Sequence, residues 1–286
     1  MRIHFLLVRR VPPVPSPVLV EVFRLLERRG FRVTGSIPEE TLVRPEELAV
    51  EHDLYVLKSH TELALSLAGV LATQDAFLVN PYASCITTQD KIVAARRLRA
   101  AGVPAPRSWV TGDLRLLREA AQETPLILKP CRGHRGAGIS VVRDARELEA
   151  VPEPQTPLLV QELVEGDGED VKVYVVGEEV FAVRKRFSET SFTQPGRPAR
   201  VSRELRAIAL ACGRVLGLGL YGLDVLETAD GPVVVDVNYF PGYKGVPDVA
   251  PRIADYIEHY ARGRIELELP AIGDAGQAAL AASAGA

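Results

Sequence analysis

Two apolar runs near the C-terminal end, separated by a short polar turn, constrain this chain more than any other feature. The runs read GLDVLE and VVVDVNYFPGY, and residues 228–232 between them form the turn, so the segment predicts a β-hairpin. Because side chains alternate along a strand, Asp236 and Asn238 share one face, and Asp224 on the first strand can project to that face. Hard oxygen ligands of this kind suit Mg²⁺. The hairpin therefore predicts a magnesium site, and the alternative is a solvated polar face.

Length and charge limit the classes of protein to consider. The chain has 286 residues, which is enough for about two or three small domains or one large α/β domain. Its 34 basic and 37 acidic residues give a net charge of −3, so there is no overall attraction to nucleic acid or to an anionic membrane. No apolar run approaches the roughly 18 residues of a membrane-spanning helix. We therefore expect a cytoplasmic protein that binds neither nucleic acid nor membrane.

Short strands and helices alternate through the N-terminal part of the chain. Strands are predicted at residues 2–8, 31–34, 53–57 and 77–79, and helices at 18–29 and 61–71. This β-α-β-α order favours a small, mostly parallel sheet covered by helices. Lys58 and His60 fall just past the third strand, at the edge where open α/β sheets usually bind ligands. The alternative for both residues is an ordinary loop.

A lysine-bearing helix follows this alternating region. It is predicted at residues 88–101, with Thr87 or Thr88 as its N-cap and Lys91 in its first turn. The prolines of the next segment, VPAPRSW, impose extended structure and lead into a strand at 108–110. On its own, a lysine in the first turn of a helix carries no functional meaning, and the alternative is a surface residue.

A glycine-rich loop comes next in the chain. A short apolar strand at 125–130 ends with Lys129, and the loop CRGHRGAGI at 131–139 joins it to a strand at 140–142. Glycines let main-chain N–H groups approach an anion closely, so the loop predicts a phosphate cradle, and the alternative is a simple turn. The loop is not a Walker motif, because G-x-x-x-x-G-K-[ST] is absent and the loop joins strand to strand.

A pair of strands with a basic end follows the acidic segment EGDGED. The strands are predicted at 171–176 and 179–186, with Lys172 on the first and Arg184 and Arg186 at the end of the second. Cations beside a phosphate loop can bind a polyanionic substrate or stabilise a transferring phosphoryl group. The alternative is a solvated basic face.

The remaining segments are predicted from composition and caps. Residues 188–200 are polar with glycine and two prolines, which predicts a loop that could cover the site. A helix capped by Ser202 is predicted to run to about residue 215, and a last helix spans 247–262. From residue 265 the sequence loses its periodicity and becomes rich in alanine and glycine, which predicts a loosely held tail.

The order of these motifs resembles the ATP-grasp superfamily, which holds ATP between two antiparallel sheets. The resemblance extends over residues 1–262 and implies an α/β (α+β) fold, in which a small parallel N-terminal layer precedes two antiparallel lobes that clamp ATP. It implies an N-terminal domain at 1–86, a central lobe at 87–160, a C-terminal lobe with the metal site at 161–264, and a flexible tail at 265–286.

The resemblance also implies roles for individual residues. ATP and Mg²⁺ are the implied cofactors, with two ions expected and Mn²⁺ as an alternative ion. The implied metal ligands are Asp224, Asp236 and Asn238. The implied nucleotide contacts are Lys91, Lys129, Gly133, Arg135, Gly136, Ala137, Gly138, Gln161, Glu162, Leu163, Val164 and Asp170. The residues implied to be catalytic are Lys172, Arg184, Arg186 and His134, of which Lys172 and Arg184 match basic residues near the γ-phosphate and acceptor. Those implied for the substrate are Lys58 and Tyr243.

Two families within the superfamily share motifs with this chain. The loop RGHRGAGISVV is similar to that of the RimK-type glutamate ligases, in which a carboxylate becomes an acyl phosphate that an amine attacks. The segments VVDVNYFPGYKG and KVYVVG, with His134 and Lys58, resemble the inositol-trisphosphate 5/6-kinases. Asp236 departs from the ligases, which usually carry Glu there.

Three functions follow from these resemblances. The first hypothesis is a carboxylate–amine ligase acting on a small-molecule or peptide acceptor. The second is a kinase for an inositol polyphosphate or similar polyol. The third is a nucleotide-binding protein without turnover. The sequence offers no clear oligomer interface and leaves the oligomeric state open.

Overall fold

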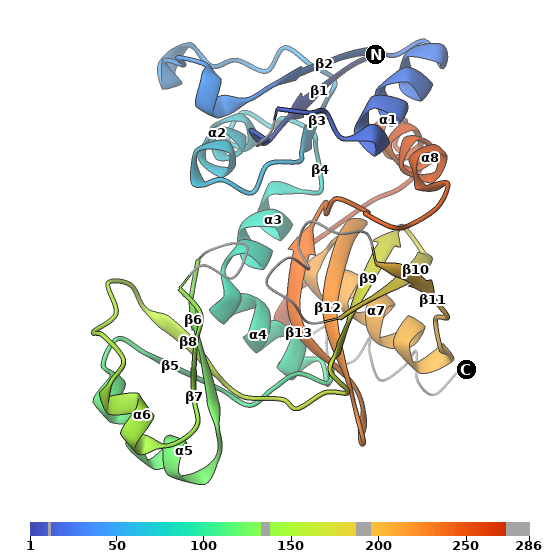
Figure 1. Cartoon of the computed structure of the whole chain (residues 1–286). Helices are drawn as coiled ribbons and strands as arrows, with labels where there is room; N and C mark the ends of the chain where they lie inside the picture. The colour runs from blue at the N-terminus through green and yellow to red at the C-terminus, as the bar shows by residue number, and fades with distance from the viewer. Residues whose placement is uncertain (11–12, 133–137, 187–195, 273–286) are drawn as a thin grey trace.

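The computed structural model of the chain describes residues 1–10, 13–132, 138–186 and 196–272, which fold into three layers (Figure 1). Each layer is built on one β-sheet: the N-terminal sheet is parallel, and the central and C-terminal sheets are antiparallel. The predicted arrangement of a small parallel layer followed by two antiparallel lobes is therefore confirmed.

The N-terminal layer is a parallel sheet with the strand order β2-β1-β3-β4. Its elements are β1 (Arg2–Leu6), α1 (Pro17–Arg28), β2 (Arg32–Ser36), β3 (Leu54–Leu57), α2 (Glu62–Ala72) and β4 (Leu78–Val79). All four residues of β3 are buried, as expected for an inner parallel strand that is covered on both faces. Thr61 caps α2, because its Oγ1 accepts a hydrogen bond from Ala64 N at 3.3 Å. The connection from β2 to β3 contains only two 3₁₀ turns, η1 (Pro38–Glu40) and η2 (Pro45–Glu47).

Two helices, α3 (Tyr82–Gln89) and α4 (Lys91–Ala100), connect the N-terminal layer to the central lobe. The sequence predicts a single helix that starts at residue 88 with a threonine cap, and this start is wrong. Asp90 has extended backbone angles, and its Oδ1 accepts hydrogen bonds from the N–H groups of residues 92 and 93 at 3.0 and 3.2 Å. The cap therefore lies at Asp90, and Lys91 is the first residue of α4.

The central lobe is an antiparallel sheet with the strand order β5-β8-β6-β7. Its elements are β5 (Ser108–Thr111), η3 (Leu114–Leu117), α5 (Arg118–Glu123), β6 (Leu126–Pro130), β7 (Ser140–Val142), α6 (Ala145–Glu149) and β8 (Leu158–Glu162). Its hydrophobic core is separate from the rest of the molecule and contains Leu126, Leu128 and Val160 from the sheet and Leu114 and Leu117 from η3.

The C-terminal lobe is an antiparallel sheet with the strand order β11-β10-β9-β12-β13. Its elements are β9 (Glu169–Val176), β10 (Glu179–Arg186), β11 (Arg197–Ala199), α7 (Arg203–Leu216), β12 (Leu220–Thr228), β13 (Gly231–Tyr239) and α8 (Val249–Ala261). The predicted hairpins β9–β10 and β12–β13 are both present. Ser202 caps α7 as predicted, because its Oγ accepts a hydrogen bond from Leu205 N at 3.0 Å.

One hydrophobic core joins the N-terminal layer to the C-terminal lobe. The amide of Asn80, which is fully buried, links the two: its Nδ2 donates to Leu220 O at 2.8 Å, and its Oδ1 accepts from the N–H groups of Gly219 and Leu220 at 2.8 and 3.0 Å. Helix α8 packs beside α1 (Figure 1), where Arg29 donates to Glu258 at 3.1 Å. These contacts fix the edge of the parallel sheet against the end of β12.

Two segments differ from the structure that their composition predicts. Residues 197–199, predicted as loop, form the edge strand β11 and pair with β10. The described part of the predicted tail, residues 265–272, packs on the body: Ile265 and Leu267 lie against the core, and the Arg97 guanidinium donates to Pro270 O. Isolated apolar side chains without periodicity are thus sufficient to hold this segment in place.

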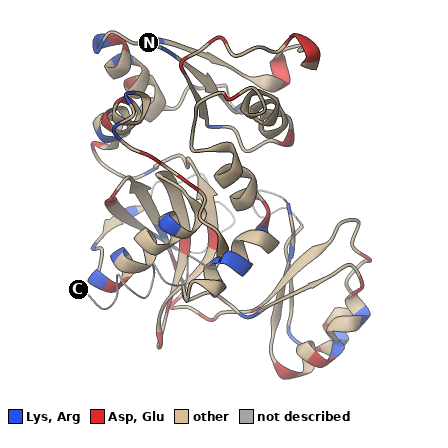
Figure 2. Cartoon of the chain, turned by 180° about the vertical axis from the view of Figure 1, so that it is seen from behind, with Lys and Arg blue, Asp and Glu red and all other residues tan. Residues whose placement is uncertain are grey.

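Charged residues of both signs are interspersed over the ribbon (Figure 2), in keeping with the net charge of −3. Among the residues that the structure describes, no helix has the length and apolar character needed to cross a membrane.

Candidate active site

A row of charged side chains crosses the five-stranded sheet. Lys172 on β9 is the register partner of Asp224 on β12, which in turn is the partner of Asp236 on β13. Directly opposed residues of antiparallel strands project to the same face, so these three side chains lie side by side. Lys172 Nζ lies 2.8 Å from Asp224 Oδ2, and Lys91 Nζ, at the start of α4, lies 2.8 Å from Asp236 Oδ1. We refer to Lys91, Asp236, Asp224 and Lys172 as the charged row.

Asp170 extends the charged row along β9. Its carboxylate lies 2.6 Å from Lys172 Nζ, and its side chain is 12% exposed. Burial by itself lowers the pKa of Lys172, but Asp224 and Asp170 outweigh it and raise that pKa above its ordinary value. Burial raises the pKa of Asp224, Lys172 opposes this shift, and Asp236 adds to it. Each lysine of the charged row thus lies beside a carboxylate that offsets its charge.

A β-bulge in β13 directs Asp236 to this face. The register runs Asp224↔Asp236 and then Val225↔Val234, which leaves Val235 as the extra residue. Without the bulge, alternation would put Asp236 on the same side as Val234, which is buried in the core. Asn238 lies two residues after Asp236 and therefore shares its face, as predicted. The three predicted metal ligands come together because of this irregularity.

Lys129 connects the central lobe to the bulge. Its side chain is buried, and its Nζ donates to Gln161 Oε1 at 2.7 Å and to Val235 O at 3.1 Å. Burial lowers the pKa of Lys129, Asp236 raises it, and Lys91 lowers it further. A cavity of about 30 Å³ beside these residues is also lined by Lys91 and Asp236. Lys129 and Lys91, which come from separate elements, therefore line the same small cavity.

The glycine-rich loop is described only at its end. Gly138 has a φ of +74°, and a Cβ there would lie 2.9 Å from Pro130 Cγ, so only glycine fits without a shift. Lys91 N donates to Cys131 O at 3.1 Å, which places the start of the loop beside the start of α4. The other predicted loop residues lie outside the described residues: Gly133, His134, Arg135, Gly136 and Ala137.

Two of the residues implied to contact the nucleotide, Glu162 and Leu163, make contacts within the central lobe. The Glu162 carboxylate accepts from Arg107 N at 3.0 Å and from Arg107 Nε at 2.8 Å. The N–H of Leu163 donates to Pro125 O at 2.7 Å. The Glu162 carboxylate and the Leu163 N–H are therefore occupied within the central lobe in this structure, and a contact of these residues with a nucleotide stays a prediction.

The structure does not bring Arg184 to the charged row. Its register partner is Val171, whose side chain alternates with those of Asp170 and Lys172, so Arg184 lies on the opposite face. There it pairs with Glu227 and, at 3.0 and 3.3 Å, with Asp167 and Glu169. Arg186 pairs with Glu169 in register at the end of β10. Nothing further is described for it.

Lys185 is the basic residue that the sequence analysis misses. It is the register partner of Asp170, it is buried, and it lies on the face of the charged row. Burial lowers its pKa, and Lys172 and Lys244 lower it further. The two-residue turn at Gly177 and Glu178 sets Asp170 opposite Lys185, so counting back from that turn would have identified it.

Tyr243 cannot serve as a substrate residue in this structure. Its side chain is 1% exposed, and its hydroxyl donates to Val175 O at 2.9 Å beneath the sheet. Its φ of +51° belongs to the left-handed region, which an aromatic residue rarely adopts. The segment after β13 therefore turns Tyr243 into the core.

Lys58 lies near the C-terminal end of β13. Its Nζ is 5.5 Å from the centroid of the Phe240 ring. Beside it, the His60 ring stacks on Tyr239 with centroids 4.2 Å apart, and Tyr239 OH donates to Ser59 O at 3.0 Å. The carboxyl edge of the parallel sheet is thus joined directly to the strand that carries Asp236.

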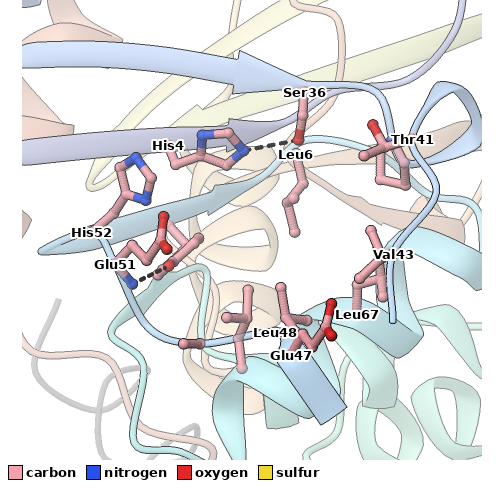
Figure 3. Close-up of a pocket in the computed structure, with 14 residues that line it drawn as sticks. His4, Leu6, Ser36, Thr41, Val43, Glu47, Leu48, Glu51, His52 and Leu67 are labelled. Carbon is pink, nitrogen blue, oxygen red and sulfur yellow. Dashed lines mark hydrogen bonds between the residues drawn. The ribbon is translucent and has the colours of Figure 1, made fainter. Parts of the chain in front are cut away.

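A cavity of about 230 Å³ in the N-terminal layer is separate from this site (Figure 3). It is lined by residues of β1 and β2, of the connection between β2 and β3, and of α2, where Leu67 lies near Val43 and Glu47 (Figure 3). His4 Nε2 is 2.8 Å from Ser36 Oγ (Figure 3), and burial together with His52 lowers the pKa of His4 to about 4. His4 is neutral at pH 7, and no residue of the charged row lines this cavity.

The donor set on the sheet fits magnesium. Asp224 and Asp236 are 27% and 31% exposed, and Asn238 adds an amide oxygen on the same face. Mg²⁺ is usually held by one or two carboxylates together with water and substrate phosphates, which this face leaves room for. Among the described residues no cluster of three His, Cys, Asp or Glu side chains suits a metal, so an all-protein cage is not built here.

Comparisons with known proteins agree with this geometry. A family model for the RimK-like ATP-grasp domain matches residues 88–257, which include the whole charged row and Lys129. A relative described as a probable alpha-L-glutamate ligase, from Vibrio parahaemolyticus, is 31% identical over 206 residues. The match covers 65% of this chain and 68% of that relative.

Solved structures share the fold. A RimK domain ATP-grasp protein from Sphaerobacter thermophilus has a TM-score of 0.74 at 23% identity, over 90% of this chain and 99% of that one. The ATP-grasp ligase PsnB, solved with a variant of its minimal precursor, Mg and ADP, has a TM-score of 0.62 at 19% identity, over 90% and 98%. Since the family model spans more than half of the chain, and the residues it covers form one charged site between two antiparallel lobes, this protein belongs to the RimK-like family of ATP-grasp ligases.

Proposed function

We propose that this protein joins the carboxylate of an acceptor to the amine of an amino acid of the glutamate type. In this reaction the acceptor carboxylate takes the γ-phosphoryl group of ATP, ADP leaves, and the amine then displaces inorganic phosphate as it forms the amide. The naming of the relative as a probable alpha-L-glutamate ligase supports the amino acid. The complex of PsnB with its precursor supports a peptide as one class of acceptor, and a small molecule is the other. Dependence on ATP supports action in the cytoplasm.

The charged row is the observation that carries this proposal. Lys91, at the start of α4, and Lys129, on β6 of the central lobe, line one space, with Asp236 at 2.8 Å from Lys91 and the Val235 carbonyl at 3.1 Å from Lys129. Two lysines held in this way are suited to bind the phosphates, and the main chain around Gly138 is suited to cover them. Lys172 lies on the same face and would neutralise charge on the transferred group. Positioning and charge neutralisation are sufficient for such chemistry, so no protein nucleophile is required.

Magnesium would be held by Asp224, Asp236 and Asn238. We propose two ions, with Mn²⁺ able to replace Mg²⁺, because two carboxylates that lie opposite each other can each reach a separate ion. When bound, the metal would supply positive charge that offsets the charge of the nucleotide phosphates. Lys91 and Lys172 hold the two carboxylates in this structure, so their ammonium groups have to give way to the metal as it binds.

The proposal is tested with γ-labelled ATP and purified protein. We expect labelled inorganic phosphate to appear only when both an acid and an amine are present, with L-glutamate among the amines. Label retained on an inositol phosphate would instead establish the kinase reaction. Nucleotide binding without release of ADP in the presence of any acid and amine would establish a protein without turnover.

A further inference from the structure

The carboxyl edge of the parallel sheet carries two cations that the charged row does not use. In the strand order β2-β1-β3-β4, the second strand lies on one side of β1, and the third and fourth strands lie on the other side. The switch point of the sheet is therefore between β1 and β3. Ligands of open α/β sheets bind outside the strand ends at such a point. Arg10 lies four residues after the end of β1, and Lys58 directly follows β3. Lys58 N donates to Leu6 O at 3.0 Å, which ties the two strand ends together.

These two cations have no anionic partner in the described part of the chain. Both side chains are half-buried, and the Nη1 of Arg10 is shielded from solvent without a hydrogen-bond acceptor. Burial lowers the pKa of Lys58 to about 8, and the neighbouring Arg10 contributes to this shift. A buried donor without a partner and two like charges near each other both cost free energy. An anion bound between them would remove both penalties.

The position of this pair relative to the charged row limits the size of its ligand. Lys58 contacts the ring of Phe240, which follows Asp236 by four residues. Four residues in extended conformation span roughly 13 Å, which sets the distance between Phe240 and Asp236. The long side chains of Arg10 and Lys58 shorten the distance that a ligand has to span between this pair and the charged row. An amino acid or the last residues of a peptide have this length.

We propose that Arg10 and Lys58 bind a second carboxylate of the substrate, one that is not activated, so that the protein selects amino acids or peptide ends that carry two carboxylates. This inference rests on the proposed ligase function and names residues that would select the substrate of that reaction. Arg10 presents a planar fork that matches a carboxylate, and Lys58 adds a point charge to it. A phosphate group offers the same oxygen chemistry, so the experiment has to compare the two sources.

Calorimetric titration measures this binding without turnover. L-Glutamate and inositol hexakisphosphate are each titrated into the full chain in the presence of Mg²⁺ and ADP. We expect L-glutamate to bind, and Arg10→Gln or Lys58→Gln to weaken it about ten- to a hundredfold, the range for a lost charge-assisted hydrogen bond. Arg9→Gln is the matched control: Arg9 is exposed and pairs with Glu40 at 3.0 Å, so its loss should change the affinity less than about twofold.

A second readout uses turnover. With ATP and hydroxylamine as the amine, the hydroxamate formed from glutarate should show a raised KM in Arg10→Gln at nearly unchanged kcat. Butyrate, which lacks the second carboxylate, should react equally poorly in both proteins. Circular dichroism of each variant checks that the fold is intact.

Each outcome decides one of the two claims. Equal affinity of wild-type and Arg10→Gln for L-glutamate, or no binding of L-glutamate to the wild type, overturns the inference. If Arg10→Gln weakens the binding of inositol hexakisphosphate but not that of L-glutamate, the assignment of the ligand as a carboxylate is overturned. Arg10-dependent binding of L-glutamate without ADP formation in the presence of any amine leaves the inference standing and overturns the proposed ligase function.

Discussion

The charged row and the carboxyl edge of the parallel sheet balance their charges in opposite ways. In the charged row each lysine has a carboxylate within 2.8 Å, and Lys172 has two. At the sheet edge, Arg10 and Lys58 have no carboxylate among the described residues, and burial lowers the pKa of Lys58 to about 8. The first region is internally neutralised and has to exchange partners when a ligand binds. The second is under electrostatic strain that a ligand relieves.

This contrast separates two roles within one site. A neutralised row gains little free energy from a single added ion, but it can rearrange around a metal and phosphates together. An unbalanced pair of cations binds one anion with a direct gain. We infer that the row serves the phosphoryl chemistry, whereas the edge determines which substrate is accepted.

The largest expected effect comes from removing a carboxylate of the row. Asp236→Asn keeps the shape of the side chain but removes the charge that Lys91 and the metal share. We expect turnover to fall about 10²- to 10³-fold, as for other losses of preorganised charge. Steady-state release of ADP measures it. Asp230→Asn, in the exposed turn of the same hairpin, is the matched control and should keep full activity. Full activity of Asp236→Asn would show that the charged row is not part of the active site.

Lys172→Met tests whether the row is internally balanced. The change leaves Asp170 and Asp224 beside each other without their shared cation. Breaking a buried ion pair by removing one partner is costly, so we expect the free energy of unfolding to fall by about 2–4 kcal/mol. Urea denaturation measures the change. A stability equal to that of the wild type would mean that water already screens these carboxylates.

The two neighbouring basic residues of β10 test which face of the sheet is used. Lys185→Gln, on the face of the charged row, should lower kcat about ten- to a hundredfold through lost charge stabilisation. Arg184→Gln, on the opposite face with Glu227, should leave kcat within about twofold and reduce stability by about 1 kcal/mol. Kinetics and thermal unfolding of both variants measure this. The reverse result would contradict the register of the β9–β10 hairpin.

Lys58→Met should act in the opposite direction to Lys172→Met. It removes an unbalanced cation, so we expect a gain of about 1 kcal/mol in the free energy of unfolding at pH 7. In the folded protein the pKa of Lys58 is about 8, below its unfolded value of 10.5. Below pH 8 both states hold the proton, so the penalty in the wild type is fully present there. Between pH 8 and 10.5 the unfolded state binds more protons, and the stability of the wild type rises.

The gain from Lys58→Met should therefore disappear as the pH rises through this range. Urea denaturation of both proteins between pH 7 and 10.5 measures it. A constant difference across the range, or a loss of stability at pH 7, would show that Lys58 already has a partner in solution.

Local sequence rules are sufficient for the two hairpins of the C-terminal lobe. A short polar turn between apolar runs specifies antiparallel pairing, and alternation then puts Asp236 and Asn238 on one face. The same rules predict the face on which Lys185 lies, because the two-residue turn at 177–178 pairs it with Asp170. The superfamily resemblance implies Arg184 instead, and the register places that residue on the opposite face.

Other features of the site depend on contacts that no local pattern contains. The bulge at Val235 arises from pairing with β12 and from the hydrogen bond of its carbonyl to Lys129, which lies 106 residues earlier. Tyr243 looks polar and available in the sequence, but a left-handed turn buries it under β9. The start of α4 moves to Asp90 because its backbone is extended between two helices.

The sequence by itself determined the order of strands, helices and charged motifs, because alternation, caps and turns act between residues that are close along the chain. Only the tertiary structure decided which charges meet. Lys91 reaches Asp236 across 145 residues, and Arg10 acts on Lys58 across 48, since these pairs depend on how one layer packs against another. The hairpin and the shared face of Asp236 and Asn238 thus follow from the sequence, whereas the bulge that sets Asp224 beside them and the lysines that contact them depend on packing.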